Sequence, residues 1–159
     1  MSASIRFAGP SDVPAIAGLI RGLARYEGLE AEVSMTETRL EAALFGPRPY
    51  AETLIAESDG QAVGFALFFH NFSTFLAKPG IYLEDLYVLE TYRAQGIGRL
   101  LLARLAGIAV ERDCGRLEWA VLDWNKDAIG FYSRLGAMPN SEWTVYRLAG
   151  DALTRLARE

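Results

Sequence analysis

A junction between an apolar stretch and a helical pattern carries the residues of this chain with the most evident chemistry. In the sequence YLEDLYVLETYRAQGIGRLL, Arg93, Gly96 and Gly98 stand directly before the helical pattern, and Glu84 and Asp85 lie a few residues upstream. The first N–H groups of a helix lack hydrogen-bond partners and the helix dipole is positive there, so such a junction can bind phosphate. We therefore predict that the junction holds a pyrophosphate and that the two carboxylates hold an amine.

Other phosphate-binding loops fit the same residues less well. The chain has no GxxxxGK[ST] sequence, which excludes a P-loop, and a dinucleotide GxGxxG would need glycine at position 101, where the chain has Leu101. An ordinary glycine-rich turn remains the alternative on spacing alone.

Length and composition restrict the class of protein. The chain has 159 residues, which suits a single domain over residues 1–159, and its net charge of -4 argues against a nucleic-acid partner. A single cysteine, Cys114, and a single histidine, His70, leave no Cys-based zinc site and no histidine cluster, so we expect no metal. The N-terminus lacks a signal-peptide pattern and no apolar run is long enough to span a membrane, so we expect a cytoplasmic protein with no membrane partner.

The helices and strands that must position these residues can be predicted from the periodicity of apolar residues and from residues that cap helices or form turns. Ser11 is a candidate helix N-cap, Thr36 another, and Asp59-Gly60 is a hairpin turn signal. The order is that of a mixed sheet flanked by helices, an α/β or α+β domain. We predict strands over 4–8, 53–58, 62–69, 80–88, 116–122 and 143–149, and helices over 11–28, 36–45, 126–135 and 151–159. A further amphipathic helix is predicted after Gly96, where apolar residues recur at 97, 100, 101, 105 and 108.

Two stretches of the chain resemble the GCN5-related N-acetyltransferases. RAQGIG at 93–98 is similar to the Q/R-x-x-G-x-G/A pyrophosphate loop of that family, and VLDWNKDAIGFYSRLGA at 121–137 is similar to its next strand and helix. The element order matches over almost the whole chain. LARYE at 23–27, YLEDLYV at 82–88 and YRAQGIG at 92–98 look like the diamine (spermidine/spermine-like) acetyltransferase branch.

This resemblance implies a fold and a cofactor site. The fold would be a mixed, mostly antiparallel sheet of six to seven strands with four to five helices, in which splayed strands form a cleft for coenzyme A. The co-substrate would be acetyl-CoA, held by an exposed strand edge, by the glycine turn and by the start of the following helix. The implied cofactor-binding residues are Leu86, Tyr87, Val88, Arg93, Ala94, Gln95, Gly96, Ile97, Gly98, Arg99, Asn125, Lys126, Asp127 and Ala128.

The resemblance also implies direct transfer of acetyl to a primary amine of a diamine, a polyamine or a lysine-like acceptor. Glu84 would accept the proton of the amine and Tyr132 would protonate the departing thiolate. Asp85 would lie on the opposite face of its strand from Glu84 unless a bulge intervenes. The implied substrate-binding residues are Tyr26, Glu27, Glu84, Asp85, Glu118 and Trp143, of which Trp143 follows a segment shorter than is usual in the branch.

Two other functions remain open from the sequence. The acceptor could be a protein N-terminus, a lysine side chain or an aminoglycoside, or the chain could be a non-catalytic acyl-CoA-binding regulatory domain. Tyr132 and Glu84 favour an enzyme, because a binding module needs neither side chain. The resemblance further implies a homodimer, for which the apolar segment 143–149 is a plausible contact.

Overall fold

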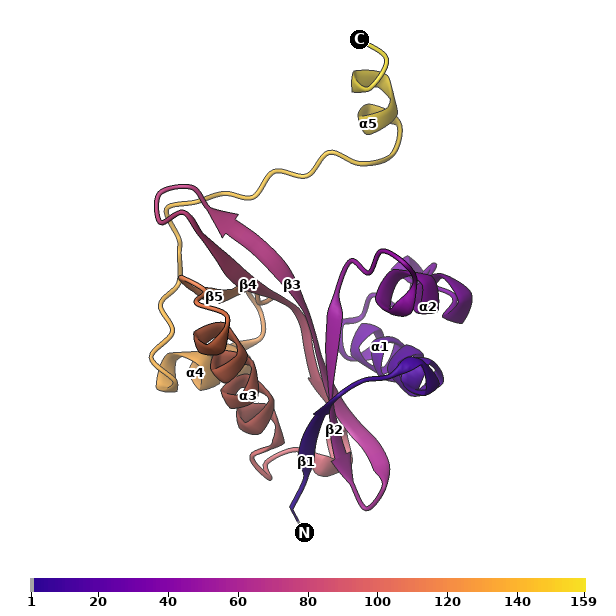
Figure 1. Cartoon of the computed structure of the whole chain (residues 1–159), viewed down its shortest axis with the longest axis vertical. Coiled ribbons are helices and arrows are strands. Elements are labelled where there is room, and N and C mark those ends of the chain that lie inside the picture. Colours follow the sequence, from indigo (N-terminus) through magenta and orange to yellow (C-terminus); the bar gives the residue numbers. More distant parts are fainter. Residues whose placement is uncertain (1) are drawn as a thin grey trace. The chain divides into compact units, whose positions relative to one another are not determined.

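The computed structural model describes residues 2–159, which divide into two compact units between Ala120 and Val121. Over these residues the chain has one sheet and five α-helices (Figure 1). The elements are β1 (Ser4–Phe7), α1 (Val13–Glu27), α2 (Glu37–Phe45), β2 (Glu52–Ser58), β3 (Gln61–Ser73), β4 (Lys78–Val88), α3 (Ile97–Glu111), β5 (Leu117–Trp119), α4 (Lys126–Arg134) and α5 (Gly150–Leu156).

The sheet of the first unit is mixed, and its strands lie side by side in chain order from β1 to β5. Neighbouring strands from β1 to β4 are antiparallel, while β5 pairs in parallel with β4. The β2–β3 connection is the predicted tight turn, since Asp59 and Gly60 have φ values of 51° and 75°. The expected class, a mixed and mostly antiparallel sheet flanked by helices, is confirmed.

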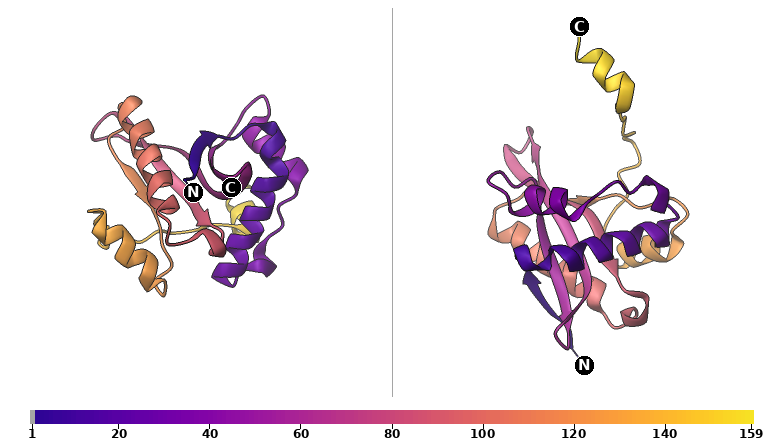
Figure 2. Two further views of the ribbon diagram at one scale, coloured as in Figure 1. Left: turned by 90° about the horizontal axis from the view of Figure 1, so that it is seen from below. Right: turned by 90° about the vertical axis from the view of Figure 1, so that its right-hand side faces the viewer.

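Helices cover both faces of this sheet. Figures 1 and 2 show α1 and α2 on one face and α3 on the other. On the first face, Ile16 and Leu40 of the helices pack with Ile55 and Phe65 of the strands in one buried cluster. On the α3 side, the helix buries Leu101, Leu105 and Ile108. Strands covered on both faces explain the nearly continuous apolar runs in the sequence.

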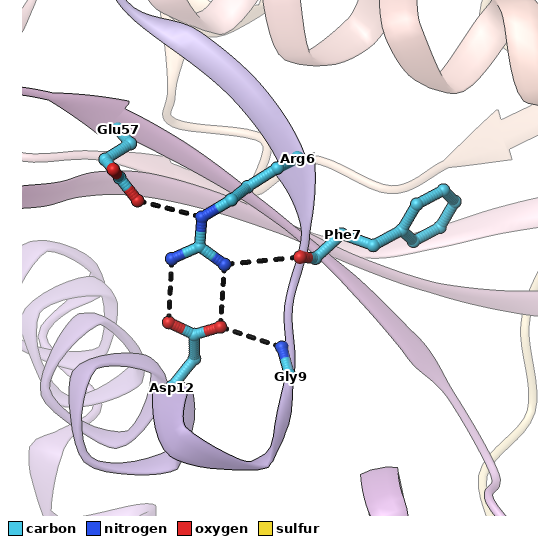
Figure 3. Close-up of polar contacts among 5 residues, drawn as sticks. All are labelled: Arg6, Phe7, Gly9, Asp12 and Glu57. Carbon is cyan, nitrogen blue, oxygen red and sulfur yellow. Dashed lines mark hydrogen bonds and ion pairs between the residues drawn. The ribbon is translucent and has the colours of Figure 1, made fainter. Parts of the chain in front are cut away.

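The first helix begins differently from the sequence prediction. Residues 10–12 form a short 3-10 helix, and the side chain that satisfies a backbone donor is that of Asp12, which accepts from the Gly9 N–H at 2.7 Å; Ser11 is not the cap. Arg6 fixes this corner, because its guanidinium donates to both oxygens of Asp12 at 2.8 and 2.9 Å and to Glu57 at 2.8 Å (Figure 3). The hydrogen bond from Arg6 lowers the pKa of Asp12. The other end of α1 agrees with prediction, since Gly28 ends the helix with φ 71°.

Two strand predictions are wrong. Residues 143–149 contain no strand, and the strand predicted over 116–122 is restricted to Leu117–Trp119. The described chain therefore has five strands, not six to seven. An alternating apolar pattern makes a segment suitable for a sheet, but a strand forms only where a neighbour accepts its backbone hydrogen bonds. Among the helices of residues 2–159, none is long and apolar enough to cross a membrane.

Candidate active site

A β-bulge at Glu84 places the two central carboxylates of the site. Leu83 pairs with Phe68 and Asp85 with Leu67, so Glu84 is an extra residue without a cross-strand partner. Because of this extra residue, Tyr82 and Asp85 lie on one face of the sheet although they are three positions apart. That face is the one that packs against α1, since Leu67 is part of the packing around the α1–α2 cluster.

Near this bulge, the charges of two carboxylates affect the pKa of a third. Burial raises the pKa of Asp85 to about 6, and the charges of Glu84 and Glu27 add to the effect. Glu27 is the last residue of α1, and burial raises its pKa as well. Glu84 itself is exposed. The structure therefore brings together three of the predicted substrate residues, one from a helix end and two from a bulged strand.

Glu118 lies beside this group but already has partners. It pairs with Tyr82 across the β4–β5 ladder and accepts from Arg116 at 2.8 Å and from Asn71 at 3.1 Å. Burial raises the pKa of Tyr82, and the charges of Glu84 and Glu118 contribute. Because the carboxylate of Glu118 is already paired with Arg116 and Asn71, it has less negative charge to offer a cationic ligand than the carboxylate of Asp85 has.

The turn before α3 has the geometry that the glycine spacing predicted. Gly96 is the residue that precedes the helix and has φ 80°, and Ala94 is also left-handed at φ 60°. No side chain caps α3, and the backbone N–H of Leu100 donates to the Gly96 carbonyl at 3.0 Å, which begins the hydrogen bonding of the helix. The amides of Ile97, Gly98 and Arg99 precede it and are positioned to receive an anion. The turn residues from Arg93 to Gly96 are exposed.

Gly98 has a different reason for being glycine. It lies inside α3, its φ is not positive, and a methyl group built at its Cα would meet nothing within 4 Å. Neither its backbone conformation nor its packing therefore requires glycine. A Cβ at this position would lie in open space.

The side chain of Arg93 lies over two tyrosine rings. Its Cζ is 4.8 Å from the ring centroid of Tyr26 and 5.5 Å from that of Tyr87, and its Nε donates to the Val88 carbonyl at 2.9 Å. Tyr87 in turn packs closely on Gly22 of α1, where an added Cβ would come within 2.9 Å of the hydroxyl oxygen. Sequence reasoning missed these contacts; the one available signal was a glycine on the buried face of α1.

The end of β4 offers a strand edge. Leu86, Tyr87 and Val88 pair with β3 on one side. On the other side, the pairing with β5 ends at Leu83, so in the first unit no strand of the described sheet continues along residues 84–88.

The second unit carries the remaining predicted residues. Asn125 is the N-cap of α4, and its Oδ1 accepts from the Ala128 N–H at 3.3 Å; Lys126, Asp127 and Ala128 form the first turn of that helix. Tyr132 lies in the same helix, with its ring centroid 5.6 Å from that of Phe131. Trp143 lies in the segment without secondary structure and is 75% exposed. Among residues 2–159, no three His, Cys, Asp or Glu side chains are arranged to hold a metal ion.

Comparisons with known proteins agree on one family. A model of the Acetyltransferase (GNAT) family matches residues 20–137. A thialysine N-epsilon-acetyltransferase of Bos taurus is 40% identical over 164 residues, which span 96% of this chain and 96% of that protein. An L-ornithine N5-acetyltransferase of Arabidopsis thaliana is 36% identical over 96% of this chain and 87% of its own length. Among solved structures, an integron cassette protein from the mobile metagenome of V. cholerae has a TM-score of 0.84 at 28% identity, covering 100% of this chain and 99% of that one.

Proposed function

The chain belongs to the acetyltransferase (GNAT) family and is an acetyl-CoA-dependent N-acetyltransferase, and we propose that its acceptor is a primary amine of a small diamine, polyamine or lysine-like molecule. The observation that carries the choice of acceptor is the group of Glu27, Glu84 and Asp85, in which the charges of Glu84 and Glu27 raise the pKa of Asp85. Relatives named for thialysine and for ornithine act on amines with a second charged end, and the acidic group suits such an acceptor.

The first unit offers two elements that fit coenzyme A. The amides at the start of α3 suit its pyrophosphate, with Gly98 leaving room for the phosphates and Gly96 making the turn. The edge of β4 at Leu86, Tyr87 and Val88 suits the amide-rich pantetheine arm, because an unpaired strand edge presents backbone donors and acceptors. Acetyl-CoA supplies the acetyl group as a thioester.

On the second unit, we propose that the start of α4 also contributes to coenzyme binding. The residues concerned are Asn125, Lys126, Asp127 and Ala128, which form the N-cap and first turn of that helix. The cap made by Asn125 holds the turn in shape.

The acceptor must lose a proton before it can attack. An amine of the lysine type has a pKa of about 10.4, so roughly one molecule in a few thousand is neutral at pH 7. We propose that Glu84, exposed at the bulge, accepts this proton directly or through water. Asp85, Glu27 and Tyr26 would hold the cationic remainder of the acceptor, with weaker contributions from Glu118 and Trp143.

Tyr132 is proposed as the acid that protonates the departing thiolate. A phenol has an ordinary pKa of about 10 and can donate a proton to a sulfur anion. Replacing Tyr132 by Phe removes the proton and keeps the ring. We expect kcat to fall by about 100-fold, the lower end of what a general acid contributes, while coenzyme A still binds.

The acceptor class is tested by a panel of amines that includes thialysine, ornithine, spermidine and an aminoglycoside, with free thiol release as the readout. Turnover on a small diamine is expected. If no small diamine is a substrate, the acceptor proposal is wrong. If Tyr132→Phe leaves turnover unchanged while calorimetry shows normal coenzyme A binding, the role given to Tyr132 is wrong.

We further propose a homodimer and a cytoplasmic location. Large apolar side chains are exposed at the end of the β3–β4 hairpin, where Phe75 is fully exposed, and in the C-terminal segment, where Val145 and Tyr146 are more than 90% exposed. A second copy of the chain would cover such surface. The location is suggested by the use of a single cysteine, Cys114, which is free.

A further inference from the structure

Arg93 stands at the start of the turn that leads into α3, yet its side chain turns back toward α1. We propose that Arg93 is a positioning residue that ties this turn to the last turn of α1, and thereby couples coenzyme binding to amine binding. This inference rests on the proposed function. It gives the Arg93 side chain a different role from the added charge beside phosphate that the glycine spacing suggested.

The contacts of the Arg93 guanidinium link the turn before α3 to the end of α1. The Arg93 Cζ lies 4.8 Å from the centroid of Tyr26 and 5.5 Å from that of Tyr87, both within the range of a cation–π contact. The Nε donates to the last carbonyl of β4, that of Val88, at 2.9 Å. One side chain thus contacts a helix end, a strand end and, through its own backbone, the turn between them.

Tyr87 completes the connection to α1. Its hydroxyl oxygen and ring lie so close to Gly22 that a Cβ there would be within 2.9–3.0 Å of them. Gly22 and Tyr26 are four residues apart in α1 and so lie on one face of that helix. The Tyr87 ring and the Arg93 guanidinium therefore contact successive turns of the same helix face.

The helix end held in this way carries the amine side of the site. Glu27 follows Tyr26 directly, and its charge reaches Asp85 on β4. If Arg93 is lost, the last turn of α1 loses a contact and so does the turn that presents the amides of α3. Both the amine and the coenzyme should then bind less well.

Replacing Arg93 by lysine distinguishes a positioning role from a direct contact with phosphate. Arg93→Lys keeps the positive charge but lacks both the planar guanidinium and the Nε–H, whereas Arg93→Gln lacks the charge as well. A positioning role predicts that both variants raise the KM for the amine by about threefold to tenfold and that Lys does not restore it. A phosphate contact predicts instead that Arg93→Gln raises only the KM for acetyl-CoA, and that Arg93→Lys largely restores the wild-type value.

Arg99→Gln is the matched control, since Arg99 lies in the first turn of α3. We expect it to change the KM for acetyl-CoA and not that for the amine.

The reciprocal experiment needs no turnover. Tyr26→Leu removes a ring at the amine end of the site and changes no residue of the turn. We expect coenzyme A, titrated by calorimetry with no amine present, to bind about threefold to tenfold more weakly to this variant. The effects of Tyr26→Leu and Arg93→Lys on this affinity should be less than multiplicative in the double variant, because both break one contact.

Normal coenzyme A affinity in Tyr26→Leu, or multiplicative effects in the double variant, would overturn the inference. So would Arg93→Lys with an unchanged KM for the amine. If an Arg93 variant does not fold, Tyr26→Leu alone decides the question. Because calorimetry with coenzyme A does not depend on the acceptor, a failure of the proposed amine chemistry would be seen separately.

Discussion

At the scale of one residue, Asp85 is a carboxylate whose surroundings disfavour its ionised form. The side chain is half-buried on the α1 face of the sheet, and two other carboxylates, Glu27 and Glu84, lie close enough to raise its pKa. Each of these features disfavours the ionised form. The positive charge of an acceptor would favour the ionised form and offset these effects, which is why such a group suits the binding of an ammonium ion.

The pH dependence of activity should report on this residue. Asp85 titrates at about pH 6, so we expect kcat/KM for a diamine to fall below about pH 6 as the carboxylate is protonated. Glu27→Gln removes one of the charges that raise this pKa, so the acidic limb of the profile should move to lower pH. The exposed Glu32→Gln is the control and should leave the limb in place. An acidic limb that does not respond to Glu27→Gln would show that Asp85 does not set it.

Stability should respond to Asp85 in the opposite sense from activity. Its pKa in the folded chain, about 6, is above the ordinary 3.8, so between these values the folded state holds a proton that the unfolded state has released. The free energy of unfolding therefore falls as the pH rises from about 4 to about 6, by about 3 kcal/mol at most. Asp85→Asn, which has no charge, should stabilise the protein by about 1–3 kcal/mol at pH 7.5 and much less at pH 4, while reducing activity. Urea unfolding at the two pH values measures this, and equal effects at both would contradict it.

Some site residues could be predicted from the sequence and others could not. The spacing in YLEDLYV and the resemblance named Glu84, Asp85, Tyr26 and Glu27, because these depend on local sequence. The contact of Arg93 with Tyr26 joins residues 67 positions apart, and no local pattern indicates it. Which face Asp85 occupies depends on the bulge, which the sequence allowed but did not specify.

At the scale of elements, the two glycines of the α3 turn differ in backbone conformation. Gly96 is left-handed and makes the turn, while Gly98 is in the helix and only leaves space. The sequence predicted both as one phosphate-binding pattern. The structure separates them, because only Gly96 has a backbone conformation that other residues resist.

Alanine at each position should therefore have a different effect. Gly96→Ala should destabilise the protein by about 1–2 kcal/mol, the cost of a left-handed residue with a Cβ. Gly98→Ala should leave stability unchanged or raise it by up to about 1 kcal/mol, since alanine favours helix, yet it should weaken coenzyme A binding by intruding on the anion site. Thermal denaturation and calorimetry measure the two effects. Wild-type affinity in Gly98→Ala would contradict the position assigned to the pyrophosphate.

The segment 143–149 shows why a local pattern can mislead at this scale. WTVYRLA has the apolar content of a strand, but in the structure it has no strand partner and its side chains are exposed. By contrast, β2 and β3 follow one another through a two-residue turn, so their pairing is local and the sequence predicted it correctly. Pairing between distant segments was the part of the fold that periodicity did not determine.

At the scale of the whole molecule, the exposed apolar side chains favour self-association. We expect the protein to sediment at twice the mass of one chain. The double change Val145→Asp and Tyr146→Asp places charges on side chains that are 91% and 93% exposed, and it should shift the protein toward monomer. The double change Ser141→Asp and Thr144→Asp is the matched control, because it adds the same two charges to exposed positions of the same stretch without removing an apolar side chain. A wild-type monomer, or a double variant that sediments like wild type, would contradict the dimer.

The unpaired residue in β4 also bears on how this sheet tolerates changes in length. At most positions of a buried strand, deleting one residue turns every side chain on one side of the deletion to the opposite face of the sheet. Core and surface side chains are then exchanged. Position 84 is different, because Leu83 and Asp85 already have adjacent partners in β3. A shortened enzyme that lacks Glu84 would keep every other β4 side chain on its present side. Evolution or a protein engineer can therefore omit this one position and still retain the scaffold, which makes the deletion a clean probe of what the proposed base contributes to turnover.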